Sequence, residues 1–456
     1  MREIDVVQQD LKSIWRRLVA LLGERAAPFA AELLLLLRDL DSDPARDAAA
    51  EVRALVASYA NADETISRRV AALLERTRSL RAERAPDEGD PRDIGGDEGE
   101  AVPVESPSPR HVSVPVWYAT DRNHQPGQPA SRRYGIDRSA HEAGESPLAY
   151  GLAAVSIPDG HRKGRMESPK WYKLQFRENP DLHIMVESVD ELGHSSWLES
   201  LRTAGGAGAA LDATDTSDDI LVFVHGYRTG WADAIKRAAQ FSYDLEFDGR
   251  TVAYTWPSQG KLLSYTVDEN NAAWAGPHFS QLLRDLLENS GARRVHLVAH
   301  SMGNRIMSAA IHDLADALAG FPTHLGNVIF AAPDVDADTF RELITAFQAV
   351  DAVEEHPRPR LTLYSCGADA ALDLSRRIHK LRRAGDARDG IVVVPPMDTI
   401  EVTQIVLDDP TDDRTGHAYF CSNRHVIADL NSVVLRGAAP PRFGLEPADG
   451  GRYWRL

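Results

Sequence analysis

The sequence contains almost no cysteine. Cys366 and Cys421 are the only two among 456 residues, and nothing in their spacing demands a bond between them. Such a chain is not a small scaffold held together by disulfides. Two free thiols in a reducing compartment are the simplest expectation, and we predict a cytoplasmic protein.

Long apolar runs are also missing. The longest, over residues 33–37, is far too short to cross a bilayer, which takes about 20 residues. Near the N-terminus the apolar residues are spaced among charges, without the continuous apolar core of a signal peptide. We therefore expect no transmembrane segment and no secretion signal.

Basic residues are fewer than acidic ones, 51 against 68. The formal net charge of −17 argues against nucleic-acid binding. Otherwise the composition is ordinary for a globular protein, with 43% hydrophobic and 26% charged residues. No metal-ligand or nucleotide-binding pattern stands out, so we expect no nucleic-acid partner, no metal and no cofactor.

The first 85 residues carry apolar stripes at alternating spacings of three and four, the pattern of amphipathic helices. Pro28 and Pro44 stand where further helices would begin. We predict a small all-helical bundle, either closed on itself or open to self-association or a protein partner. The two clearest stripes are Ile4, Val7, Leu11, Ile14, Leu18 and Leu21, and then Ile66, Val70, Leu73, Thr77 and Leu80.

An acidic stretch rich in proline and glycine follows over residues 86–109. Between residues 87 and 100, seven acidic residues accompany a single basic one, Arg92, which gives a local charge of −6. Such a composition cannot bury a core, and it predicts a flexible linker.

From residue 110 onwards, strand patterns alternate with helix patterns. The run Ile220-Leu221-Val222-Phe223-Val224 is purely apolar, which indicates a strand buried on both faces of a parallel sheet. Alternation of this kind is typical of a doubly wound α/β fold. We predict a catalytic domain over residues 110–436 and a C-terminal tail over residues 437–456. Further strands are predicted at residues 251–256, 295–299, 327–331, 360–365 and 399–407.

The segment around residue 301 has the form of a nucleophile elbow, in which a strand turns sharply into a helix at a serine. The apolar strand stops at His300-Ser301-Met302-Gly303, and a helix-forming sequence follows. Small residues are needed two positions to either side of the serine, because strand and helix almost touch there. Gly303 meets this need, and Ala299 stands where glycine is usual. The alternative is an ordinary serine cap of a helix.

A serine nucleophile needs a base, and the base needs an acid to orient it. In the α/β-hydrolase fold both follow the nucleophile, the acid first and the histidine last. Asp369 comes just after the strand of residues 360–365, and His417 lies beyond the last predicted strand. Asp369 also suits a helix cap, so Asp334 remains an alternative acid. We predict the triad Ser301, Asp369 and His417.

Two backbone amides are expected to form the oxyanion hole. One belongs to Met302, which follows the nucleophile, and the other to Tyr227, in the turn after the purely apolar strand. Gly226 lets the main chain approach the substrate closely. We expect His225, Gly226 and Gly303 to support the site.

Several short motifs occur in an order known from one family. They are Tyr118-Ala119-Thr120-Asp121-Arg122, Phe223-Val224-His225-Gly226-Tyr227, Thr255-Trp256-Pro257-Ser258, Ala299-His300-Ser301-Met302-Gly303-Asn304-Arg305, Ala331-Ala332-Pro333-Asp334 and Gly416-His417. On these motifs the chain resembles the bacterial α/β hydrolases grouped as domain-of-unknown-function family nine hundred, described as esterase- or lipase-like. The resemblance covers about residues 110–436, and in that family too the elbow begins with alanine. It implies serine-dependent hydrolysis with no agreed substrate.

The leading hypothesis is a carboxylesterase-like serine hydrolase that acts on a small-molecule ester or other acyl substrate. The interval between Asp336 and Arg360 leaves little room for a large lid, which favours an open cleft and short acyl chains. The second hypothesis is an interaction or effector protein whose hydrolase domain is a scaffold, or is regulated by residues 1–85. The intact order of the triad favours an enzyme, because a scaffold has no need of all three groups.

Overall fold

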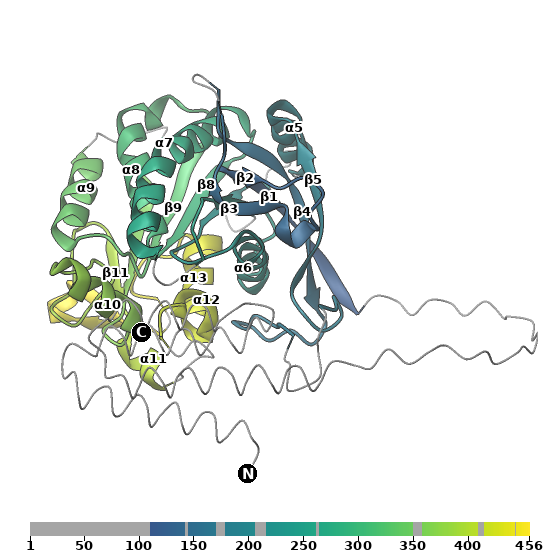
Figure 1. Ribbon diagram of the computed structural model, residues 1–456. Coiled ribbons are helices and arrows are strands. Elements are labelled where there is room, and N and C mark those ends of the chain that lie inside the picture. Colours follow the sequence, from purple (N-terminus) through teal and green to yellow (C-terminus); the bar gives the residue numbers. More distant parts are fainter. Residues whose placement is uncertain are drawn as a thin grey trace, which may run out of the picture. The chain divides into compact units, whose positions relative to one another are not determined.

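The computed structural model describes eight stretches of the chain, drawn in colour in Figure 1. The predicted helical domain of residues 1–85 and the predicted linker of residues 86–109 lie outside them and remain predictions. The described stretches are residues 110–141, 145–169, 178–205, 216–260, 264–349, 358–408, 415–442 and 444–456.

One large sheet runs through the described part of the chain. Its eleven strands lie in the order β12-β13-β11-β10-β9-β8-β6-β7-β1-β4-β5. The strands from β13 to β1 pair in parallel, whereas β12 at one edge and β4 and β5 at the other pair antiparallel. The predicted doubly wound, mostly parallel sheet is therefore confirmed.

The strands of this sheet are β1 (His111–Thr120), β4 (Ala149–Pro158), β5 (Met185–Leu192), β6 (Ile220–Val224), β7 (Arg250–Thr255), β8 (Arg294–His300), β9 (His324–Ala331), β10 (Arg360–Ser365), β11 (Asp398–Glu401), β12 (Glu446–Ala448) and β13 (Tyr453–Arg455). A separate two-stranded sheet joins β2 (Arg122–His124) and β3 (Tyr134–Arg138).

The central strands are buried on both faces. Every residue of β6 and of β7 is buried, as expected for parallel strands with helices on either side. Branched and aromatic side chains fill these strands because they suit a pleated surface. The carboxyl ends of β6, β7 and β8 consequently meet at one edge of the sheet, where loops are free to carry side chains.

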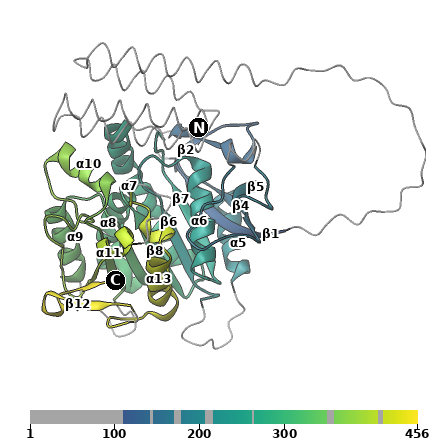
Figure 2. The ribbon, with the colours of Figure 1, turned by 90° about the horizontal axis from the view of Figure 1, so that it is seen from below.

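Helices cover the sheet in two layers (Figures 1 and 2). One apolar cluster joins the sheet to α5, α7, α8 and α9, and a second joins it to α6, α10, α12 and α13. The helices are α5 (His194–Ala204), α6 (Trp231–Asp244), α7 (Tyr265–Asn289), α8 (Gly303–Leu314), α9 (Ala337–Ala349), α10 (Ala370–His379), α11 (Thr403–Asp408), α12 (Tyr419–Ser422) and α13 (Arg424–Arg436). None of the helices described is long and apolar enough to span a membrane.

Two sequence predictions need correction. The strand predicted over residues 399–407 ends at Glu401, because the Glu401 carboxylate accepts the Thr403 N–H at 2.8 Å and α11 begins there. The predicted tail of residues 437–456 supplies β12 and β13 to the main sheet. In particular, Trp454 in β13 pairs with Ile400 of β11, so this segment extends the sheet.

Candidate active site

Ser301 stands at the corner between β8 and α8. Its φ of +53° lies in the left-handed region, which non-glycine residues rarely adopt. The corner is held from both sides, because the Ser301 N–H donates to the Ala331 carbonyl at 3.0 Å and the Ser301 carbonyl accepts the Asp334 N–H at 3.1 Å. The cap position of α8 belongs to Met302. Ser301 thus has the strained backbone expected of an elbow and does not stand at the cap.

The elbow requires glycine where it meets the turn after β6. A Cβ added to Gly303 would lie 2.4 Å from the His225 carbonyl oxygen. A Cβ on Gly226 would lie 2.8 Å from the Cβ of Ser301. Both contacts are far closer than van der Waals distance, so neither position accepts a larger residue without movement. Ala299 is fully buried inside β8 and is accommodated there, which explains the alanine at the usual glycine position.

Asp369 and His417 lie together, although 48 residues separate them. His417 Nδ1 is 2.7 Å from Asp369 Oδ2, and the Asp369 side chain is fully buried. The other carboxylate oxygen, Oδ1, accepts the backbone N–H groups of Ala371 and Leu372 at 3.0 Å each. Asp369 therefore caps α10 and contacts His417 at the same time. Asp369 can cap the helix and orient His417 at the same time, because Oδ1 serves the cap and Oδ2 contacts the histidine.

Asp334, the alternative acid, belongs to another network. Its carboxylate accepts hydroxyl hydrogen bonds from Ser375, at 2.5 Å, and from Tyr265. Arg383 lies 3.4 Å and Arg305 3.9 Å from the same carboxylate. Burial alone would raise the pKa of Asp334, but the two arginines and the hydroxyl groups keep it below its ordinary value. The contacts of this carboxylate favour a structural role that joins α7, α8 and α10.

His300 connects Ser301 to the loop that carries His417. It precedes Ser301, and its ring centroid lies 4.5 Å from that of His417. Its Nε2–H donates to the His417 carbonyl at 3.1 Å, and its ring stacks on Phe420. The sequence around His300 does not predict its contact with His417. That contact depends on a loop more than 100 residues further along the chain.

The two predicted oxyanion amides belong to segments that touch each other. Met302 is fully buried at the start of α8, and the turn carrying Tyr227 lies against the elbow through Gly226. The ring of Tyr227 packs 5.3 Å from that of Tyr265, the first residue of α7. The turn is therefore held between the elbow and α7, which restricts its movement.

The thiol closest in sequence to Asp369 is not a competing nucleophile. Cys366 and Cys421 are both buried, and they form no disulfide with each other. Burial, with Asp369 nearby, raises the pKa of the Cys366 thiol to about 12, so the reactive thiolate is scarce at neutral pH.

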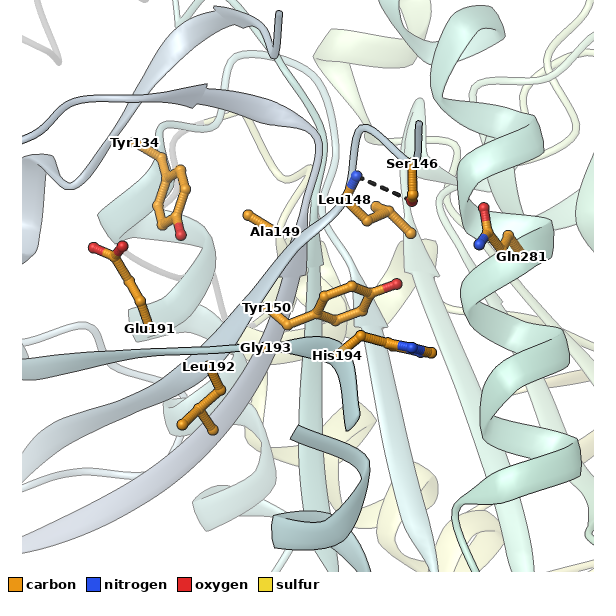
Figure 3. A pocket seen from close by; sticks show the side chains of 10 residues that line it. All are labelled: Tyr134, Ser146, Leu148, Ala149, Tyr150, Glu191, Leu192, Gly193, His194 and Gln281. Atoms are coloured by element: carbon orange, nitrogen blue, oxygen red, sulfur yellow. Dashed lines mark hydrogen bonds between the residues drawn. The ribbon is translucent and has the colours of Figure 1, made fainter. Parts of the chain in front are cut away.

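A cavity of about 460 Å³ lies away from these residues, where β4 begins and β5 ends (Figure 3). Figure 3 shows Tyr150 and His194 on the side of α7, with Tyr134 and Glu191 beyond Ala149. The cavity shares no residue with the elbow, the Asp369–His417 pair or the turn of Tyr227. It therefore does not enlarge the site around Ser301. Its lining consists of Tyr134, Ser146, Leu148, Ala149, Tyr150, Glu191, Leu192, Gly193, His194 and Gln281.

Comparison with known families agrees with this architecture. Residues 209–433 match the model of the family described as "Alpha/beta hydrolase of unknown function (DUF900)". The matched range begins just before β6, so it includes the elbow, Asp369, His417 and the turn of Tyr227, but not the motif that ends at Arg122. No curated protein matches the chain.

Proposed function

Through residues 209–433 the chain belongs to this family of α/β hydrolases, and from that premise we propose a serine hydrolase that cleaves ester-type acyl bonds. The observation that carries the proposal is the 2.7 Å contact between His417 and the buried Asp369. That pair lies beside His300, which immediately precedes the strained Ser301. Serine, histidine and aspartate in this relation are the parts of an acyl-transfer triad.

In the proposed reaction, Ser301 Oγ attacks the acyl carbon while His417 takes the hydroxyl proton. Asp369 holds the His417 ring with its proton on Nδ1, so that Nε2 can act as the base. The Tyr227 and Met302 amides stabilise the negative charge on the former carbonyl oxygen. The alkoxide leaves with the proton from His417, and an acyl group remains on Ser301. Water, deprotonated by His417, then attacks that ester, and the acid is released as His417 returns the proton to Ser301 Oγ.

The surroundings of the triad support this assignment. Asp369 is fully buried and receives two backbone N–H groups, so its carboxylate orientation is fixed. His417 is 15% exposed and can meet a substrate. The strained corner at Ser301 is held by main-chain bonds on both sides, which preorganises the nucleophile.

A fluorophosphonate probe tests the proposal directly, because it forms a stable adduct only with an activated serine. We expect the purified full chain to be labelled and mass spectrometry to locate the adduct on Ser301. Ser301→Ala should abolish labelling. Ser308→Ala is the matched control: Ser308 is a buried serine of α8, seven residues after Ser301, and this variant should be labelled like the natural protein. An unlabelled natural protein would overturn the proposal.

Nitrophenyl esters then test the substrate class. The expected order of kcat/KM is acetate and butyrate above palmitate, since the sequence favours an open site for short acyl chains. Ser301→Ala should lower turnover by roughly 10³-fold or more with any of them. Preference for the palmitate ester would contradict the short-chain assignment while leaving the serine chemistry intact.

A further inference from the structure

The turn after β6 contains a peptide unit whose direction is fixed by a side chain. His225 Nδ1 lies 2.8 Å from the Gly226 carbonyl oxygen, so the ring donates its proton to that carbonyl. The Gly226 carbonyl and the Tyr227 N–H belong to the same trans peptide unit, and they point in opposite directions. A bond to the Gly226 carbonyl therefore also sets the direction of the Tyr227 N–H.

The other nitrogen of His225 fixes which nitrogen carries the proton. Nε2 lies 3.2 Å from the backbone nitrogen of Trp256 and 3.2 Å from Arg122 Nη2, and both of these groups are donors. Nε2 must accept, so the single proton of the neutral ring is on Nδ1. The ring also stacks on the Trp256 indole at 5.1 Å, which prevents it from turning over. Burial, together with the charge of Arg122, lowers the pKa of His225 to about 3, and the ring stays neutral.

Arg122 is a fully buried cation with neutral partners. Besides His225, its guanidinium donates to the carbonyls of Thr229 at 2.7 Å, Gly135 at 3.1 Å and Ser258 at 3.3 Å. Within the described stretches no carboxylate forms a direct ion pair with it, although the charges of Asp121, Asp268 and Asp233 act to raise its pKa. Burial lowers its pKa to about 10, which leaves it charged at neutral pH. Burying a cation without a direct ion pair is costly, so this position calls for an explanation beyond packing.

The four acceptors of Arg122 surround the turn of Tyr227. Thr229 lies two residues after Tyr227 and His225 two residues before it, while Ser258 follows β7 and Gly135 lies in β3. One planar group thus binds both ends of the turn to two neighbouring segments. A guanidinium suits this task because its five N–H groups form a rigid fork.

We propose that Arg122 is a positioning residue for the oxyanion hole and acts through the tautomer of His225. Together with the Trp256 N–H, Arg122 keeps the proton of His225 on Nδ1; His225 then holds the Gly226 carbonyl, and the Tyr227 N–H faces the reacting oxygen. This inference rests on the proposed hydrolase function of the same site. Its physical core, the tautomer of His225, can be measured whether or not the protein hydrolyses an ester.

The first measurement needs no variant. Two-dimensional spectra of the full chain labelled with ¹⁵N-histidine report which ring nitrogen carries the proton, and the His225 signals are those missing from His225→Asn. We expect the Nδ1–H form, unchanged from pH 8 to pH 5. An Nε2–H form, or an imidazolium in that range, would overturn the inference.

The second measurement is kinetic. Arg122→Met should reduce both the kcat for p-nitrophenyl acetate and the rate of fluorophosphonate labelling about 10²-fold, as for loss of one oxyanion donor, with KM changed less than about threefold. In the same variant the His225 signals should shift to a mixture of tautomers or titrate above pH 5. Arg122→Lys, which keeps one charged donor, should recover part of the rate.

Arg250 provides the matched control. It is also buried, and its guanidinium donates to the Leu201 and Asp218 carbonyls, but it stands at the opposite end of β7. Arg250→Met should lower the melting temperature and leave kcat within about twofold. Equal loss of kcat in both variants, or a normal kcat and an unchanged tautomer in Arg122→Met, would overturn the inference. A natural protein without labelling or hydrolysis would instead refute the hydrolase proposal, and the tautomer would still be measured.

Discussion

Two aspartate–histidine pairs lie at opposite ends of the same sheet. At the carboxyl ends of the parallel strands, Asp369 contacts His417 at 2.7 Å. At the amino ends, Asp219 contacts His296 at 3.2 Å. Both aspartates are fully buried. The chemistry of the pair alone therefore does not distinguish a candidate catalytic site from a structural one.

The surroundings of the two pairs differ. The Asp219 carboxylate also binds Arg293 and Arg294, at 3.1 and 2.7 Å. His296 is fully buried, and its Nδ1 accepts the Asn327 backbone N–H at 3.0 Å, so both of its nitrogens are occupied. His417, by contrast, is partly exposed beside the elbow. An aspartate–histidine pair becomes a candidate for catalysis only when the histidine keeps access to a substrate.

The largest expected effect is on kcat, and it distinguishes the two pairs when each aspartate is replaced by asparagine. Asp369→Asn should lower kcat by about 10³–10⁴-fold, because an amide leaves His417 in the wrong tautomer. Its stability should change little, since an asparagine oxygen can still cap α10. Asp219→Asn should leave kcat within about twofold and reduce the free energy of unfolding by roughly 3 kcal/mol, as expected for a broken buried ion pair. Ester kinetics and urea denaturation measure the two quantities.

If folded Asp219→Asn lost turnover at unchanged stability, the Asp219–His296 pair would not be purely structural, and the contrast between the two pairs would be wrong. Normal turnover in Asp369→Asn would remove Asp369 from the triad.

Asp334→Asn gives a smaller effect on turnover and sharpens the choice of acid. We expect less than about tenfold loss in kcat, because the contacts of Asp334 run to Tyr265, Ser375, Arg305 and Arg383. Stability should fall by roughly 2 kcal/mol, as two arginines lose a buried partner. If this variant lost 10³-fold while Asp369→Asn did not, Asp334 would be the acid.

The smallest expected effect is a pH dependence of stability at the amino end of the sheet. Burial lowers the pKa of His296 below its ordinary value of 6.5. The unfolded chain therefore takes up a proton below pH 6.5 that the folded protein does not. The stability associated with His296 is complete above this pH and falls below it, by at most about 1.4 kcal/mol per pH unit. Urea denaturation at pH 7, 6 and 5 measures the slope, which His296→Gln should reduce.

His161 serves as the opposite control. Burial would lower its pKa, but hydrogen bonds to Asp244 and Glu167 raise it to about 9. Its contribution is complete below pH 6.5 and is lost as the pH rises to about 9. His161→Asn should therefore change how the free energy of unfolding depends on pH between pH 7 and 9. It should leave that dependence unaltered below pH 6.5. If His296→Gln leaves the fall in unfolding free energy below pH 6.5 unchanged, His296 is not the cause of that fall.

Features encoded by consecutive residues could be predicted from the sequence. The elbow is visible in the sequence because strand, corner and helix follow one another without interruption around Ser301. The positions of Asp369 and His417 follow from counting strands after the elbow. The doubly wound fold is confirmed, whereas the catalytic roles of these three residues remain predictions.

What could not be predicted depends on the order of strands in the sheet. Arg122 and His225 are 103 residues apart in sequence, and they meet because β1 lies beside β7 and β7 beside β6. No sequence pattern around Arg122 or around His225 predicts that the two side chains are in contact. The same holds at the other edge, where β13 joins β11 although its sequence resembles an irregular tail. Long-range pairings of this kind are decided by packing of the whole sheet.

The positive φ of Ser301 also bears on selection. A non-glycine residue in this conformation costs about 1–2 kcal/mol, whereas glycine adopts it at almost no cost. Single domains are commonly stable by only about 5–15 kcal/mol, so one residue gives up a noticeable share of that margin. Selection for stability alone would replace the serine with glycine. Folding and the proposed reactivity of Ser301 thus make opposite demands on the same position, and a library screened only for heat resistance should lose the serine there.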